Sequence, residues 1–141
     1  MIKTASLVVL SYFLFAASPV FAAKPVAPDA VSGTILVNAE QAVEIILSNP
    51  KLVVIDARHD EEYAKGHIEG AVNLLDSELT PEMLALHAAS KDTPLLIYCN
   101  GERCLRSSNA AKKAVAWGYR KIYWFRGGWN EWIEKKLPIA K

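Results

Sequence analysis

Cysteine and histidine are both scarce in this chain. Its 141 residues include two cysteines, Cys99 and Cys104, and three histidines, His59, His67 and His87. A protein zinc site draws its ligands from such residues at close spacing, and these five are scattered. The sequence therefore gives no indication of a metal site. It also raises the question of why both cysteines lie in one short stretch.

An excess of charge of either sign is absent as well. The chain has 16 lysines and arginines against 15 aspartates and glutamates, a formal net charge of +1. Proteins whose main partner is nucleic acid or an anionic membrane concentrate positive charge. We therefore expect neither nucleic acid nor a membrane surface to be the main partner.

One long apolar run occurs, at the N-terminus, and it is short for a membrane span. Residues 5–17 are mostly apolar, whereas a membrane-crossing helix needs roughly 20 such residues. Lys3 precedes this run, and small residues lead up to Ala22. The pattern predicts that residues 1–22 are a secretory signal peptide cleaved after Ala22. The alternative is an uncleaved N-terminal anchor.

Cleavage after Ala22 has consequences for the mature protein. The residue directly after the cut is not a cysteine, so a lipid-modified N-terminus is not expected, and we expect no membrane partner for the mature chain. Its location would be exported, either periplasmic or secreted. Exported proteins fold in oxidising surroundings, where two nearby cysteines are able to form a disulfide.

The rest of the chain divides into a linker and one α/β domain. Residues 23–33 contain two prolines and few large apolar residues, which is typical of an extended linker, and residues 34–138 form the domain. Strand-like runs alternate there with segments of helical spacing, which predicts a largely parallel sheet. The expected strands cover 34–37, 52–56, 71–75, 94–99 and 121–125. The expected helices follow Asn38, His59, Thr80, Ser107 or Ser108, and Arg126.

The two cysteines lie where one of these strands ends. Parallel sheets bind ligands beyond the carboxyl ends of their strands, and Cys99 ends the run at 94–99. A polar loop follows, containing Arg103 and Arg106, and a helix begins near its end. Free loop amides, a helix N-terminus and two arginines would stabilise a thiolate or a small anion. The competing interpretation is that Cys99 is a small buried residue at a strand end.

Three blocks of sequence, in a fixed order, carry a more specific pattern. They are VVIDARHDEEYAKGHIEGAVNL (Val53–Leu74), YCNGERCLRSSNAA (Tyr98–Ala111) and GYRKIYWFRGGWNEW (Gly118–Trp132). Together they resemble the rhodanese family over residues 35–137. The resemblance implies a rhodanese-like α/β fold, with a central, mostly parallel sheet flanked by helices on both faces.

The resemblance also implies a chemistry. In that family the cysteine ending the central strand, here Cys99, takes sulfane sulfur from thiosulfate or a similar small anion. The resulting persulfide passes its sulfur to a thiol or a cyanide-like acceptor, which is covalent catalysis. No organic or metal cofactor is implied. The substrate-binding residues would be those of the loop: Asn100, Gly101, Glu102, Arg103, Cys104 and Arg106.

The loop departs from the family pattern in its length. Rhodanese loops commonly place an arginine at the sixth position counted from the catalytic cysteine. Here Cys104 takes that position and Arg106 takes the eighth, so the loop is two residues longer. Related phosphatases on this fold also have a longer loop, which leaves the substrate open and keeps phosphatase activity as a remote alternative.

Cys104 leaves three interpretations open. It could form a disulfide with Cys99, resolve a persulfide or sulfenate on Cys99, or be a packed bystander. A disulfide would silence sulfur transfer until a thiol reductant, such as a thiol reductant protein, opened it. Two alternatives to a sulfurtransferase follow: a thiol–disulfide redox protein using both cysteines, or a binding module that kept the fold without turnover.

Two further groups of residues lie near the expected site. Asp56 and Arg58 follow a strand end on the same side as Cys99, where we expect a supporting role, as an ion pair or as contacts to the loop or substrate. His67 belongs to the family's turn motif and is expected to be structural. Trp129 and Trp132 lie three positions apart and are expected to pack on the sheet.

Overall fold

The computed structural model describes residues 17–141. Most of the expected signal peptide, residues 1–22, lies outside this range, so the leader stays a prediction. Within residues 17–141, none of the helices has the length and apolar character that crossing a membrane requires.

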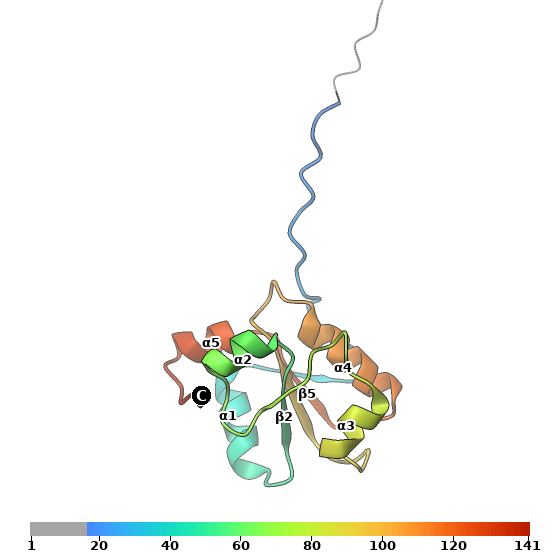
Figure 1. Cartoon of the computed structure of the whole chain (residues 1–141), viewed down its shortest axis with the longest axis vertical. Coiled ribbons are helices and arrows are strands. Elements are labelled where there is room, and N and C mark those ends of the chain that lie inside the picture. The colour runs from blue at the N-terminus through green and yellow to red at the C-terminus, as the bar shows by residue number, and fades with distance from the viewer. Residues whose placement is uncertain (1–16) are drawn as a thin grey trace, which may run out of the picture.

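A single five-stranded sheet forms the centre of the domain (Figure 1). The strands are β1 (Ile35–Val37), β2 (Val53–Asp56), β3 (Val72–Asn73), β4 (Leu95–Tyr98) and β5 (Ile122–Phe125). Their order across the sheet is β1-β5-β4-β2-β3, and every neighbouring pair is parallel. β4 is central and buried along its whole length, as its continuous apolar sequence predicts.

Helices cover both faces of this sheet, which confirms the expected fold class. The helices are α1 (Ala39–Ser48), α2 (Asp60–Lys65), α3 (Pro81–His87), α4 (Arg106–Ala116) and α5 (Gly128–Glu134). One core packs α3 and α4 against alternate residues of the central strands, including Ile97 and Trp124. The other packs α1 and α5 against the opposite face, including Leu96 and Phe125. The alternation follows from the two-residue period of a strand.

Helix starts are explained by capping at two positions, and the expected cap at a third is wrong. Asn38 and Gln41 form a capping box at the start of α1. At the start of α3, the Thr80 hydroxyl accepts a hydrogen bond from the Met83 amide. Helix α4 instead starts after Leu105, without a side-chain cap. The hydroxyls of the two expected caps are used elsewhere.

Tertiary contacts explain the missing cap. Ser107 accepts a hydrogen bond from the indole of Trp124 at 3.0 Å, and Ser108 donates to the Leu105 carbonyl at 2.9 Å. Both serines are buried, whereas a capping residue stands at the helix end. The packing of α4 on the sheet therefore takes precedence over the local capping preference.

The segment expected to be a linker, residues 23–33, is packed on the domain over its second half. Ala27 and Val31 are buried in the core that α4 covers, and the Ala27 amide donates to the Glu102 carbonyl at 2.6 Å. Arg126 donates to the carbonyls of Ala27 and Pro28 at 3.0 and 2.9 Å. In Figure 1 the blue N-terminal segment leaves the domain beside the orange loop that joins β4 to α4.

Helix α5 begins directly against the end of β4. The Trp129 amide donates to the Cys99 carbonyl and the Asn130 amide to the Asn100 carbonyl, both at 2.8 Å. Gly128 has a φ of 54°, and a Cβ there would overlap the Cys99 carbonyl. A glycine is therefore required at this position for the helix to approach the cysteine backbone.

We expect Gly128→Ala to be far more destabilising than Gly70→Ala. Both glycines have positive φ, but a Cβ at Gly70 meets nothing within 4 Å. Gly70→Ala should lower the free energy of unfolding by about 1 kcal/mol, the cost of left-handed backbone. Gly128→Ala adds steric overlap and should lower it by more than about 3 kcal/mol. Urea denaturation of the two variants measures this, and equal losses would contradict the close approach.

Candidate active site

Cys99 lies immediately beyond the carboxyl end of β4, between the ends of β2 and β5. In the sheet register Asp56 of β2 and Phe125 of β5 pair with Tyr98, the residue before the cysteine. Cys99 is 1% exposed and Cys104 is 8% exposed. The expected nucleophile is therefore placed at a strand end, in a buried position beneath its loop.

Cys99 and Cys104 form a disulfide. Their Cα atoms are 6.3 Å apart, within the range that disulfides span. A turn closes the loop between them, in which the Cys104 amide donates to the Gly101 carbonyl at 2.9 Å. Of the three interpretations of Cys104, the structure shows the bridged state.

The loop backbone keeps several donors available. Among the described residues, no backbone carbonyl accepts a hydrogen bond from the amides of Gly101, Glu102, Arg103 or Leu105. Successive free amides make a concavity that binds anions. The loop thus retains the backbone groups that an anionic sulfur or a small oxyanion would use.

A hollow of about 450 Å³ opens at the loop. Arg103 and Arg106 both line it, as does Cys104, whereas Cys99 does not. Arg103 is exposed and has no ion pair within residues 17–141. A small anion entering this hollow would meet the guanidinium groups of Arg103 and Arg106 and the sulfur of Cys104.

The other expected loop residues have different environments. Glu102 forms an ion pair with Arg126 at 2.7 Å and does not line the hollow. Gly101 is buried, and a Cβ there would come within 2.9 Å of the Asn130 side-chain nitrogen. Glu102 therefore fixes the path of the loop, while Asn100 and Gly101 line the hollow together with the arginines.

Glu62 of α2 is a site residue that the sequence patterns did not identify. It accepts a hydrogen bond from the Asn100 side chain at 2.8 Å and one from Arg106 at 3.2 Å. The signal available was the acidic residue before Tyr63 in the first family block, but 38 positions separate it from Asn100. Glu62 thereby anchors both ends of the loop from Asn100 to Arg106, the active loop of the candidate site.

The environment of Glu62 keeps its carboxylate charged. Burial alone would raise the pKa of Glu62. Hydrogen bonds from Asn100 and the His59 amide, with the charges of two nearby arginines, outweigh burial and lower the pKa of Glu62 below its ordinary value. The charged form is the one that holds the loop.

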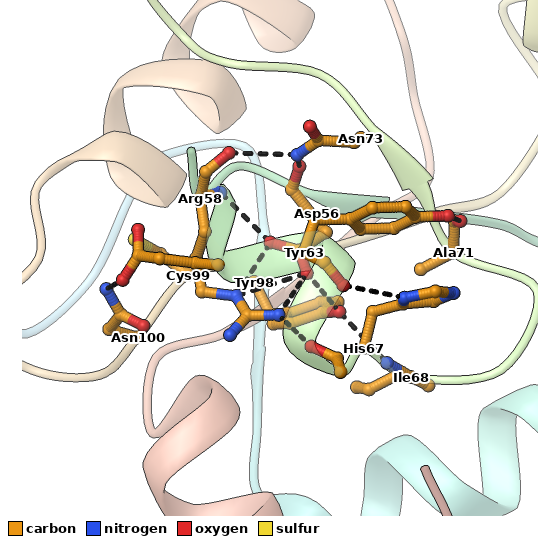
Figure 2. A network of polar contacts seen from close by, with 12 residues as sticks. Asp56, Arg58, Tyr63, His67, Ile68, Ala71, Asn73, Tyr98, Cys99 and Asn100 are labelled. Carbon is orange, nitrogen blue, oxygen red and sulfur yellow. Dashed lines mark hydrogen bonds and ion pairs between the residues drawn. The ribbon is translucent and has the colours of Figure 1, made fainter. Parts of the chain in front are cut away.

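A buried polar network lies under the site (Figure 2). Asp56 and Arg58 form an ion pair at 2.7 Å, with side chains 0% and 2% exposed. The Tyr98 hydroxyl donates a hydrogen bond to Asp56 at 2.6 Å and accepts one from the Ile68 amide at 3.1 Å. Burial, followed by the charge and hydrogen bond of Asp56, raises the pKa of Tyr98, so the phenol stays protonated as a donor.

Arg58 carries this network to the elements around Cys99. It donates to the Gly66 carbonyl at 2.7 Å, and its guanidinium lies 4.4 Å from the ring centroid of Trp129. Burial would lower the pKa of Arg58, but the hydrogen bond and charge of Asp56 outweigh it and raise the pKa. Asp56 and Arg58 do not line the hollow, so they position the site and do not contact a ligand in the hollow.

His67 and the tryptophans have structural environments, as expected. The His67 ring stacks on Tyr63 with centroids 3.8 Å apart, and its Nδ1 lies 2.9 Å from the Tyr63 carbonyl. Both tryptophans belong to α5. Trp132 is 4% exposed and packs on the sheet, and Trp129 packs against the same core.

We expect Glu62→Gln to loosen the active loop and Glu61→Gln to have no effect. Glu61 is the exposed neighbour of Glu62 in α2, and it makes no side-chain ion pair within residues 17–141. Loss of the charged acceptor should lower the free energy of unfolding by about 1 kcal/mol at neutral pH, since the carboxylate is partly exposed. Urea denaturation measures this difference.

The pH dependence supplies a second check on Glu62. A lowered pKa in the folded state means that the stabilisation is present above the pKa of the unfolded chain and is lost as the pH falls through the folded value. The gap between wild type and Glu62→Gln should therefore close on acidification. A gap that persists in acid would contradict an electrostatic anchor.

Sequence relatives extend over most of the domain. The uncharacterized protein YibN of Escherichia coli K12 is 30% identical over 97 residues, which are 68% of this chain and 66% of that protein. The tRNA uridine(34) hydroxylase of Escherichia coli O1:K1 is 33% identical over an alignment of 113 residues that covers 70% of this chain and 30% of that enzyme. The chain thus spans just under two thirds of the first relative and a smaller part of the second.

Solved structures agree with the architecture. The polysulfide-sulfur transferase homodimer of Wolinella succinogenes superposes with a TM-score of 0.63 at 21% identity, covering 77% of this chain and 79% of that one. This likeness shows the fold. The family model of the rhodanese-like domain matches residues 38–135, which is most of the described chain. The chain therefore belongs to the rhodanese family.

Proposed function

We propose that this protein is an exported sulfurtransferase in which Cys99 carries sulfane sulfur as a persulfide. The observation that carries the proposal is the position of Cys99, at the carboxyl end of the central strand and at the head of a loop with free amides. Two arginines line the hollow above it. Such a loop would stabilise negative charge on sulfur through both steps of the transfer.

The proposed reaction begins with the reduced protein. The Cys99 thiolate attacks the outer sulfur of thiosulfate or a similar anion, and the donor's sulfur–sulfur bond breaks as sulfite leaves with the electron pair. A thiolate or cyanide then attacks the outer sulfur of the persulfide, which returns Cys99 as thiolate. The disulfide must be opened by a thiol before the first step.

Two further observations support the proposal. The Wolinella succinogenes protein with this fold is named a polysulfide-sulfur transferase, which fits a donor in which sulfur is bonded to sulfur. The apolar N-terminal run and the bridged cysteines fit an exported protein, because disulfides persist in oxidising compartments. We accordingly place the proposed activity in the periplasm or outside the cell.

Thiosulfate should load one sulfur onto the reduced protein. We expect Cys104→Ser, in which the loop disulfide cannot form, to gain about 32 Da in intact mass, mapped to Cys99, and to yield thiocyanate on addition of cyanide. Cys99→Ser should do neither, while Ala116→Ser, an exposed change on α4, should alter neither result when it is added to Cys104→Ser. A reduced Cys104→Ser protein that gains no mass and yields no thiocyanate would refute the sulfurtransferase.

The disulfide favours one second candidate, a thiol–disulfide exchange protein. Oxidoreductases of that kind have reduction potentials between about −120 and −270 mV, whereas structural disulfides lie below about −300 mV. Equilibration of the Cys99–Cys104 pair with glutathione measures its potential. A value in the first range would support exchange with partner thiols, and a value in the second would exclude it.

A further inference from the structure

The second sulfur of the loop has no part in the transfer proposed above. A persulfide on Cys99 needs a donor, an acceptor and a stabilising loop, but not another cysteine. Yet Cys104 is the residue bonded to Cys99, and it alone of the two lines the hollow. Its position therefore calls for a chemical role of its own.

We infer that Cys104 resolves the Cys99 persulfide and releases the carried sulfur as hydrosulfide. This inference rests on the proposed function, since it needs a persulfide on Cys99. The Cys104 sulfur attacks Sγ of Cys99 and forms the disulfide seen in the structure. The bond from Cys99 Sγ to the outer sulfur breaks, and the outer sulfur leaves with the electron pair and takes the Cys104 proton as hydrosulfide.

The loop holds Cys104 where this attack requires it. The turn from Gly101 to Cys104 brings the Cα atoms of the two cysteines to 6.3 Å. At the start of α5, the Trp129 amide donates a hydrogen bond to the Cys99 carbonyl and fixes it in place. Gly101 approaches Asn130 so closely that the first half of the loop has little room to open. Bond formation between the two sulfurs therefore needs no rearrangement of the strand or of α5.

A dithiol completes the cycle as the named co-reactant. Its first thiolate attacks Cys104, the sulfur beside the hollow, and expels Cys99 as thiolate into the loop. Its second thiol displaces Cys104 and leaves the dithiol oxidised. The balance is one thiosulfate and one dithiol converted to sulfite, hydrosulfide, one oxidised dithiol and one proton. With this cycle the protein reduces sulfane sulfur instead of only relaying it.

A single-turnover experiment without oxygen tests the inference. Reduced protein, freed of reductant, receives one equivalent of thiosulfate, and intact mass and hydrosulfide are followed. Wild type should release one hydrosulfide per chain and end about 2 Da lighter than the reduced protein, as a disulfide. Cys104→Ser should keep an adduct of about 32 Da and release hydrosulfide at least 10-fold more slowly.

The variants separate the two proposals. The adduct on Cys104→Ser itself shows that the variant is folded and loads sulfur, and Cys104→Ala should behave in the same way. If wild type holds its adduct as long as Cys104→Ser does, or if the sulfur is found on Cys104, the resolving role is overturned while Cys99 transfer stands. If wild type gains no adduct and releases no hydrosulfide, both proposals are overturned.

Discussion

The buried carboxylate of Asp56 is the group on which the geometry of the site depends. Removing a charge from water is costly, and a buried ion pair persists only when its remaining hydrogen-bonding capacity is satisfied. Asp56 meets that condition through the Arg58 guanidinium and the Tyr98 hydroxyl. Through these partners it joins the ends of β2 and β4 to the turn at Gly66 and to Trp129 of α5.

The active loop is held by different forces on different sides. Helix α5 binds the backbone at Cys99 with neutral hydrogen bonds in a buried setting, while Glu62 binds the side chains of Asn100 and Arg106 through a partly exposed charge. The contact of Ala27 with the Glu102 carbonyl adds a third attachment. Backbone bonds fix the cysteine itself, and the weaker contacts lie where the loop must admit a ligand.

Sequence patterns predicted what depends on neighbours in the chain and missed what depends on distant ones. Strand runs, the Asn38 and Thr80 caps, and the position of Cys99 all follow from local periodicity or local chemistry. The anchoring role of Glu62 and the packing of Ala27 rest on contacts across 38 and 75 positions. The α4 cap was mispredicted for the same reason, because the distant Trp124 donates a hydrogen bond to Ser107.

The two sulfurs of the disulfide differ in environment, and this difference determines which one a thiol attacks and which one it expels. An incoming thiol attacks the sulfur that it reaches and expels the one whose thiolate is better stabilised. Here Cys104 lines the hollow, while Cys99 is 1% exposed at the strand end and heads a loop with free amides. Reduction through Cys104 would therefore regenerate the nucleophile at Cys99 in place. The features that would suit Cys99 to hold anionic sulfur would also suit it to leave a disulfide, so the loop proposed to transfer sulfur is also one that a thiol can open.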